Sequence, residues 1–340
     1  MQNPTGKRKR SLLIVIVVLI AAAAAVVLLL FFRGVEKKAD VVPENAGTAV
    51  TREEAEEKEA IYYNGSKYVP NKDLSTLLIL GIDDPVLTES ETVRNQSQAD
   101  FILLAVFDPA AETCKMIQIN RDSMCEIPLL DSAGKNIGTR KEQIALSHTY
   151  GSSQAQRCEN TVKAVTDLMY GIKIDNYFAI TMDGIPILND PVGGVTVTIE
   201  DDFTGVDETL IKGETVTLTS ENVEHYVRSR FTRQDDSTNI ARMRRQRTYM
   251  SGLFQKLGEA NRKDSGFFLR AYDAISGSMV SDCSVDQMSD YAELLSDYQL
   301  SDIVTLEGES VLGETYMEYY PDEAALQQLV IDTFYQKVEG

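Results

Sequence analysis

Residues 11–32, with the sequence SLLIVIVVLIAAAAAVVLLLFF, constrain this chain most because all 22 lack a charge. A helix of that length is roughly 33 Å long, enough to cross the hydrocarbon core of a bilayer. A cleaved signal peptide would have a shorter apolar run and a small-residue cleavage site. A buried helix of a soluble protein is the other alternative, but such helices seldom stay uncharged for so long. We therefore predict a single uncleaved transmembrane anchor at the N-terminus.

The residues on either side of this run predict its orientation. The segment KRKR, residues 7–10, precedes it, which places residues 1–10 in the cytoplasm by the positive-inside rule. Residues 33–70 include the charged run TREEAEEKEA, which has no apolar stripe and is typical of a tether. We therefore expect a single-pass protein of the cell membrane, with an extracellular linker over 33–70 and an extracellular folded domain over 71–340.

Composition narrows the function. The chain carries 33 basic and 52 acidic residues, a net charge of −19, which argues against nucleic acid as the partner. Its only histidines, His148 and His225, are too few for a histidine-centred triad or zinc site, and we interpret both as structural. Its cysteines have no metal-binding spacing, and outside the cytoplasm they are compatible with either disulfides or buried free thiols. They are Cys114, Cys125, Cys158 and Cys283.

Three apolar segments predict buried strands, and each has polar residues at its end. They are LSTLLILGIDD (74–84), ADFILLAVFDP (99–109) and TCKMIQINRD (113–122). Asp83 follows the first, Asp100 begins the second and Arg121 ends the third. The third strand is expected to pair with the second across the turn DPAAE, and one such antiparallel hairpin can bring these three side chains to the same edge of the sheet. Carboxylates in such a position suit a hard cation such as Mg²⁺.

A second polar cluster lies at 226–250, YVRSRFTRQDDSTNIARMRRQRTYM. Its seven cations are all arginines, whose planar fork of donors suits phosphate and carboxylate oxygens. The plain alternative is a solvated basic helix balanced by nearby acids. The arginines are Arg228, Arg230, Arg233, Arg242, Arg244, Arg245 and Arg247.

This cluster predicts two arms joined by the polar loop 234–238. A short helix ends near Arg228 and Arg230, and a longer helix begins near Asn239. We expect Arg242 and Gln246 to flank the buried stripe of the longer helix and Arg244 to face water. The stripe comprises Ile240, Met243, Met250, Phe254 and Leu257.

The remaining chain alternates strands and helices, which predicts a mixed α/β domain. We expect helices at 159–170 and 322–337, strands at 177–182 and 193–199, a helical region at 264–300 and an edge strand at 303–312.

Read in order, several segments resemble the LytR-CpsA-Psr family. They are LLILGIDD, ADFILLAVFDP, INRDS, LSHTYG, DGIPILNDPVGGVTV, HYVRSR and NIARMRRQR, which follow the apolar N-terminal run. The resemblance implies an α/β/α sandwich around a central mixed sheet, with an apolar pocket for a polyprenyl chain. It also implies attachment of teichoic acids, capsular polysaccharides or other glycopolymers to peptidoglycan.

The resemblance also implies roles for single residues. Asp83 and Asp100 match magnesium-binding aspartates, and Arg121 matches the arginine most closely tied to catalysis. The residues that match the pyrophosphate-binding positions are Arg228, Arg230, Arg242 and Gln246. The chain departs from the family where cations are often found, carrying Asp84, Cys125 and Ala145 instead.

The expected activity is therefore a Mg²⁺-dependent phosphotransferase. It would move a glycopolymer from a polyprenyl-pyrophosphate-linked donor to peptidoglycan, beside the lipid bilayer, and release polyprenyl phosphate. The alternatives are a non-catalytic binder or sensor of polyprenyl pyrophosphate or wall polymer, and a polyprenyl-pyrophosphate hydrolase.

Overall fold

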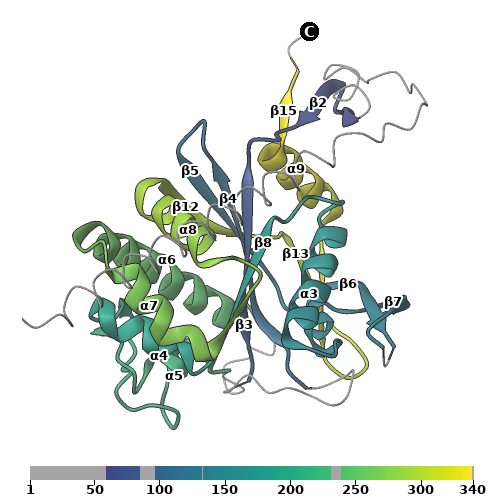
Figure 1. Ribbon diagram of the computed structural model, residues 1–340. Helices are drawn as coiled ribbons and strands as arrows, with labels where there is room; N and C mark the ends of the chain where they lie inside the picture. Colours follow the sequence, from purple (N-terminus) through teal and green to yellow (C-terminus); the bar gives the residue numbers. More distant parts are fainter. Residues whose placement is uncertain (1–58, 85–95, 132, 231–238, 339–340) are drawn as a thin grey trace, which may run out of the picture. The chain divides into compact units, whose positions relative to one another are not determined.

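A computed structural model describes residues 59–84, 96–131, 133–230 and 239–338 (Figure 1). The expected cytoplasmic tail and transmembrane anchor, together with the loop 234–238, lie outside these ranges. Among the described residues, no helix combines the length and apolar character that a membrane span needs.

The described domain is built on a six-stranded sheet with the strand order β11-β8-β3-β4-β5-β12. Two neighbouring pairs, β3 with β8 and β5 with β12, are parallel, and the other three are antiparallel. The predicted mixed sheet is thus confirmed. The strands are β3 (Ser75–Ile82), β4 (Ala99–Asp108), β5 (Thr113–Ile119), β8 (Asn176–Thr181), β11 (Met279–Ser281) and β12 (Gln299–Thr305).

The centre of the sheet is the pair of antiparallel connections β3–β4 and β4–β5, of which the sequence predicts the second. These strands are apolar almost without interruption because helices cover both of their faces. The register of β3 and β4 shifts near the site: Gly81 lies opposite Phe101, but Ile82 lies opposite Ala99. Asp100 is therefore the extra residue of a β-bulge, a feature that redirects side chains near functional sites.

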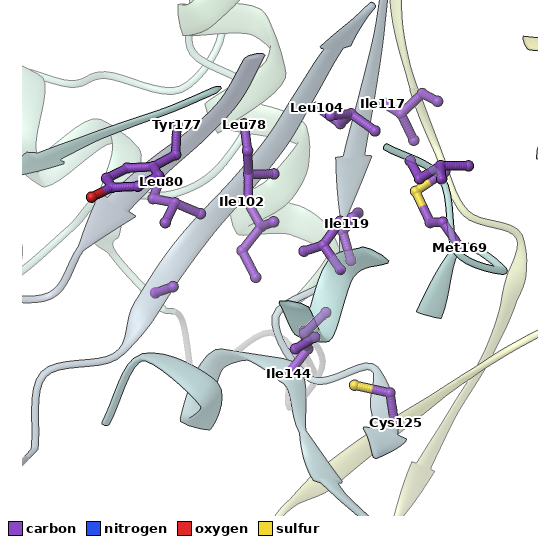
Figure 2. Packing of buried hydrophobic residues seen from close by; sticks show 14 of the residues in the cluster. Leu78, Leu80, Ile102, Leu104, Ile117, Ile119, Cys125, Ile144, Met169 and Tyr177 are labelled. Atoms are coloured by element: carbon purple, nitrogen blue, oxygen red, sulfur yellow. The ribbon is translucent and has the colours of Figure 1, made fainter. Parts of the chain in front are cut away.

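Helices pack on both faces of the sheet, which gives the expected sandwich. On one face, α3 (Gln154–Leu168) and α9 (Glu323–Phe334) share an apolar core with residues such as Leu78, Ile102 and Ile117 (Figure 2). On the other face, α6 (Ile240–Lys263), α7 (Phe267–Ile275) and α8 (Val285–Asp297) enclose a second core. Figure 1 shows these two groups of helices on opposite sides of the central strands.

A third apolar cluster lies beside α6. It involves α5 (Val223–Arg228) and the short strands β9 (Thr196–Thr198) and β10 (Thr215–Thr217). The short helix α4 (Gly184–Asn189) leads from β8 toward this cluster. The remaining short helical turns are η1 (Ile144–Thr149), η2 (Asp190–Val192) and η3 (Ser276–Ser278).

The apolar stripe predicted on α6 is correct except at its first residue. Met243 and Phe254 are buried, and Met250 and Leu257 pack against the cores. Ile240 is instead 54% exposed. It lies at the edge of the stripe in the first turn of the helix, and its side chain therefore faces solvent.

Two hairpins extend the fold beyond the central sheet: β6 (Met124–Leu130) with β7 (Asn136–Gln143), and β13 (Gly308–Leu312) with β14 (Met317–Pro321). The edge strand expected over 303–312 is therefore wrong in extent. The chain leaves the central sheet at Thr305 and starts a new strand at Gly308.

A separate three-stranded sheet joins both ends of the described chain. It pairs β1 (Ile61–Tyr63) with β2 (Ser66–Pro70), and β2 with β15 (Tyr335–Lys337). Strand pairing therefore begins at Ile61, within the range 33–70 that the sequence assigns to a linker. The pattern there is weak because these short strands are only partly buried.

Candidate active site

Three predicted site residues meet at one edge of the sheet. Asp83 directly follows β3, Asp100 lies in the bulge at the start of β4, and Arg121 comes two residues after β5. The antiparallel connections bring these strand ends together, as expected. Gly81 allows the close approach there, since a Cβ atom at this position would lie 2.9 Å from the Cβ of Phe101.

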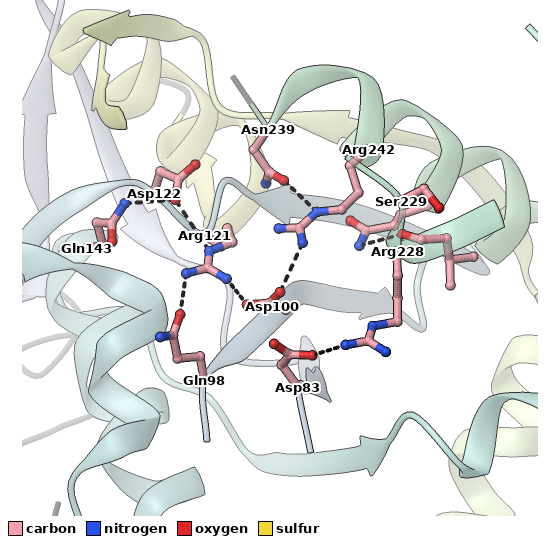
Figure 3. A network of polar contacts seen from close by, with 12 residues as sticks. Asp83, Gln98, Asp100, Arg121, Asp122, Gln143, Arg228, Ser229, Asn239 and Arg242 are labelled. Atoms are coloured by element: carbon pink, nitrogen blue, oxygen red, sulfur yellow. Dashed lines mark hydrogen bonds and ion pairs between the residues drawn. The ribbon is translucent and has the colours of Figure 1, made fainter. Parts of the chain in front are cut away.

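Asp100 is bound between two arginines from different parts of the chain (Figure 3). Arg121 donates to Oδ1 of Asp100, and Nη1 of Arg242 donates to Oδ2 at 3.0 Å. Arg242 comes from the first turn of α6, and its Nε also donates to Oδ1 of Asn239 at 2.6 Å. The two polar clusters that the sequence singles out therefore form one site.

Both of these guanidinium groups are buried. Burial is the main cause that lowers the pKa of Arg121 to about 10 and that of Arg242 to about 9. Repulsion from Arg230 lowers the pKa of both groups further, and the nearby carboxylates of Asp83 and Asp122 oppose the shift. Both side chains stay protonated at neutral pH. Nη2 of Arg242 is buried and has no hydrogen-bond partner among the described residues. The site thus holds a buried cationic donor that an oxyanion could accept from.

Arg121 is fixed from its other side as well. It donates to Oε1 of Gln98, and its Nε lies 3.3 Å from Oδ1 of Asp122. Gln143 in turn donates to the same Asp122 oxygen at 2.9 Å. These contacts leave the catalytic candidate little rotational freedom.

Arg228, the last residue of α5, reaches the site from above the sheet edge. Its Nη2 lies 2.6 Å from Oδ1 of Asp83, and its Nη1 lies 2.5 Å from Oε1 of Glu224. Burial alone would lower the pKa of Arg228, but its bonds to these two carboxylates raise it. Arg230 is exposed just beyond α5, and its charge contributes to lowering the pKa of Arg121 and Arg242. Arg228 and Arg242 therefore bind the two aspartates, and Arg230 is near enough for its charge to act on the site.

Gln246 is buried one turn after Arg242. Its Oε1 accepts from Gln118 at 3.1 Å, and its Nε2 donates weakly to the carbonyl of Val227 at 3.4 Å. Gln118 also accepts from Arg247 at 3.0 Å. The structure thus brings Gln246 to the site, while its amide is already bonded to the protein.

Arg244 points away from the site, and its neighbour Arg245 has a role that the sequence does not reveal. Arg244 is 44% exposed and pairs with Glu200 at 2.9 Å and Asp201 at 2.7 Å, so it faces water as predicted but is not free. Arg245 is buried, pairs with Asp201, and donates to the carbonyls of Tyr226 and Ser229. It therefore joins α6 to the end of α5, which carries Arg228.

An apolar cavity of about 200 Å³ opens from this site between the sheet and α4, α6, α7 and α8. Residues such as Ile79, Phe178, Phe254 and Leu295 line its length. Its charged side chains line only one end, which is the site described above, and Asn261, 15 residues after Gln246 on α6, adds one amide elsewhere in the lining. The polar lining there comprises Asp83, Asp100, Arg228, Arg242 and Gln246. A ligand that fills this cavity needs a long apolar part and a polar, anionic head.

The model of the LytR_cpsA_psr family matches residues 40–333. The chain belongs to the LytR-CpsA-Psr family. Among curated members, polyisoprenyl-teichoic acid–peptidoglycan teichoic acid transferase TagU of Enterococcus faecalis is 28% identical over 224 residues. That alignment covers 65% of this chain and 66% of TagU, slightly less than two thirds of its length.

Solved structures of family members share the fold. TagT bound to LI-WTA aligns with a TM-score of 0.58 and 21% identity, covering 78% of this chain and 90% of TagT. TagV of Bacillus subtilis aligns with a TM-score of 0.59 and 22% identity, covering 77% of this chain and 98% of TagV.

Cys125 and Ala145 stand at positions where the family often has a cation, and both residues are buried. Burial raises the pKa of the Cys125 thiol to about 12. These positions therefore supply no charge. All four cysteines, which lie within the described residues, are buried free thiols, which settles the alternative that the sequence leaves open.

The two histidines lie apart from this family site. His148 is fully buried: its Nδ1 lies 3.2 Å from the carbonyl of Ser97, and its Nε2 lies 3.7 Å from Sγ of Cys158. Burial lowers the pKa of His148 to about 4. His225 is half-exposed, with Nδ1 2.7 Å from Asp207. The structural interpretation of both agrees with these contacts.

Proposed function

We propose that the chain is a phosphotransferase that moves a wall glycopolymer from a polyprenyl-pyrophosphate-linked donor to peptidoglycan. In the proposed reaction, an acceptor sugar hydroxyl forms a P–O bond to the sugar-linked phosphorus. The bond from that phosphorus to the lipid phosphate breaks, polyprenyl phosphate leaves, and the hydroxyl proton passes to water.

The observation that carries this proposal is the shape and chemistry of the cavity. Its apolar length fits an isoprenoid chain, and its single charged end places two carboxylates among arginines. A soluble sugar or nucleotide would gain little from so apolar a channel, whereas an amphiphile buries its chain there. Membership of a family that includes teichoic acid transferases supports the same substrate class.

The arginines would act on charge that develops during transfer. Phosphoryl-transfer catalysis consists mainly of positioning and of stabilising the equatorial and leaving oxygens. Arg228 lies on the cavity side, where the lipid phosphate would leave, and the unpaired Nη2 of Arg242 is buried between the cavity and Arg121. Arg121, held rigidly by Gln98 and Asp122, would orient the transferred phosphoryl group.

The donor set at the polar end suits Mg²⁺ bound together with substrate. This ion is usually held by one or two carboxylates, with phosphate oxygens and water completing its shell. Asp83 and Asp100 both line that end, and the described residues contain no group of three or more acidic, histidine or cysteine side chains that is placed to hold a metal ion. These two aspartates would hold the ion, which would neutralise charge on the pyrophosphate. Arg228 and Arg242 would exchange their carboxylate contacts for phosphate oxygens as substrate binds.

The decisive experiment is product analysis with the purified full chain in detergent or vesicles. The chain is supplied with a labelled polyprenyl-pyrophosphate-linked glycopolymer and peptidoglycan, with and without a chelator. We expect label on peptidoglycan, one polyprenyl phosphate released for each transfer, and loss of both in chelator. Asp100→Asn should lose turnover similarly, since it removes one proposed ligand.

The products also separate the competing functions. Free glycopolymer phosphate released at the same rate with and without peptidoglycan would identify a hydrolase. Saturable donor binding without any product would identify a binder or sensor and would contradict the proposed transfer.

A further inference from the structure

The polar network of the site has two sides that face different parts of the molecule. Asp83, Asp100, Arg228 and Arg242 line the apolar cavity, but Arg121, Asp122 and Gln143 do not. In Figure 3 these three extend away from Arg228 and Arg242, with Asp100 between the two groups. One side of the network thus meets the cavity, and the other side is buried against other elements.

The elements on that side are the two hairpins, β6–β7 and β13–β14, which contact the site directly. The backbone carbonyl of Asp122 accepts from the backbone N–H of Tyr319 in β14 at 2.9 Å, and Ser123 forms an isolated parallel β-bridge with Tyr319. Gln143, at the end of β7, donates both to Asp122 and to the carbonyl of Met317 at 2.8 Å. The hairpins therefore pack directly against the turn that carries Arg121.

The exposed face of the hairpins carries aromatic rings beside charged groups. Tyr320 is 38% exposed, Nζ of Lys141 lies 5.2 Å from its ring centroid, and its hydroxyl donates to Glu318 at 2.6 Å. Tyr316, in the connection between β13 and β14, is 48% exposed. Lys141 lies on the exposed strand β7, opposite β6. Flat rings with nearby donors and acceptors offer a stacking surface to the apolar face of a sugar and hydrogen bonds to its hydroxyls.

The direction of attack decides which glycan meets this surface. In phosphoryl transfer the attacking and leaving oxygens lie roughly in line across the phosphorus. With the lipid in the cavity, polyprenyl phosphate leaves toward Arg228, so the acceptor hydroxyl approaches from the opposite side, past Arg121. The donor's own glycan is an equatorial substituent and projects sideways. The hairpins lie on the side of attack.

We propose that the face formed by Tyr316, Tyr320 and Lys141 binds the glycan strand of the acceptor and presents its hydroxyl to the site. This inference rests on the proposed function for the reaction, but the binding surface can be tested without it. No role in binding the donor's lipid or pyrophosphate is assigned to these residues.

The test compares Tyr320→Ala and Tyr316→Ala with Tyr62→Ala in the full chain. Tyr62 is 78% exposed on β1, so it controls for the loss of a surface tyrosine elsewhere. In the transfer assay, we expect each hairpin variant to raise the KM for peptidoglycan fragments roughly three- to tenfold, the size of one aromatic contact. The kcat and the KM for the lipid-linked donor should stay unchanged. Tyr320→Phe keeps the ring and should recover most of the acceptor affinity.

A second measurement uses no turnover. Binding of the full chain to purified peptidoglycan fragments free of teichoic acid should weaken by the same factor in Tyr320→Ala and not in Tyr62→Ala. If wild type performs no transfer yet this pattern holds, the proposed function fails and the acceptor surface stands. Equal acceptor binding by all three alanine variants would overturn the surface, and so would a rise in donor KM alone, which would assign the face to the donor glycan.

Discussion

At the scale of single residues, the site is defined by how two carboxylates share several guanidinium groups. Asp100 binds Arg121 and Arg242, and Asp83 binds Arg228. The paired groups are preorganised, because each arginine already points at a position where an anion is bound. In the proposed reaction, replacing carboxylate contacts by phosphate contacts would therefore require little movement of the protein, as preorganised electrostatic catalysis demands.

A comparison of Arg242 with Arg244 tests this arrangement on one helix. Arg242→Ala removes a buried donor at the polar end of the cavity and should weaken donor or transition-state binding by about 1.5–3 kcal/mol, or roughly tenfold or more. Asp100 keeps its bond to Arg121, so thermal stability should change little. Arg244→Ala removes a half-exposed side chain that pairs with Glu200 and Asp201 away from the site, and turnover should stay near that of wild type. Steady-state kinetics and thermal melts of both variants decide the matter.

Equal, small kinetic effects of the two variants would mean that the arginine cluster is only a charged surface. If Arg242→Ala unfolds the domain, its role is structural. Arg242→Lys separates charge from geometry, since it keeps the charge but loses the guanidinium fork.

Because the imidazole of His148 is buried, we predict that the stability of the domain depends on pH. Its pKa is lowered by burial from 6.5 to about 4, so as pH falls the unfolded chain binds this proton first. The free energy of unfolding should therefore fall by about 3 kcal/mol in total between pH 6.5 and 4 from this group alone. Denaturant titrations across this range should show that His148→Gln loses this part of the slope, whereas the surface variant His225→Gln keeps it. An unchanged slope in His148→Gln would contradict the burial argument.

At the scale of elements, the sequence predicts what periodicity and apolar runs encode. The strands β3, β4 and β5, the antiparallel hairpin of β4 with β5 and the helix α6 follow from patterns of buried residues. The convergence of Asp83, Asp100 and Arg121 follows from that hairpin. The resemblance added the arginines of α5 and α6 to the same site.

The parts that the sequence did not predict depend on contacts between distant segments. The bulge at Asp100 arises from a register shift against β3, and no local signal marks it. Strands β6, β7, β13 and β14 are short or exposed, so their apolar alternation is weak. The pairing of Arg245 with Asp201 joins residues 44 positions apart, and its only sequence signal was membership of the arginine cluster.

Because Arg245 links α5 to α6, we predict that one of the two acidic residues after β9 contributes much more to stability than the other. Asp201→Ala should leave the buried Arg245 without its carboxylate and lower the free energy of unfolding by about 3 kcal/mol. Glu200→Ala removes only a pair between exposed side chains and should change it by less than about 0.5 kcal/mol. Urea unfolding of the two neighbours measures this difference. Equal stabilities would show that the carbonyls of Tyr226 and Ser229 suffice to hold Arg245.

At the scale of the whole molecule, the two faces of the central sheet differ in how they are packed. One face and its helices enclose an apolar cavity, and the other face packs into a solid core. The polar site lies at the sheet edge between the cavity and the two hairpins. A lipid-linked substrate would thus enter from one side and its acceptor from the other, which agrees with in-line displacement at phosphorus.

The final prediction concerns how the chain is placed relative to the membrane. A donor carried by the bilayer is confined to a thin layer, and an anchored enzyme meets it at a far higher effective concentration than a free one. We predict that residues 11–32 provide this anchor, with KRKR in the cytoplasm and the domain outside.

A protease added to intact, wall-stripped cells should therefore degrade the full chain beyond Arg33 and spare a cytoplasmic tag at the N-terminus. A cytoplasmic control protein should remain whole until detergent is added. Protection of the large domain until lysis would place it in the cytoplasm, where neither an exported lipid-linked polymer nor peptidoglycan could reach its site.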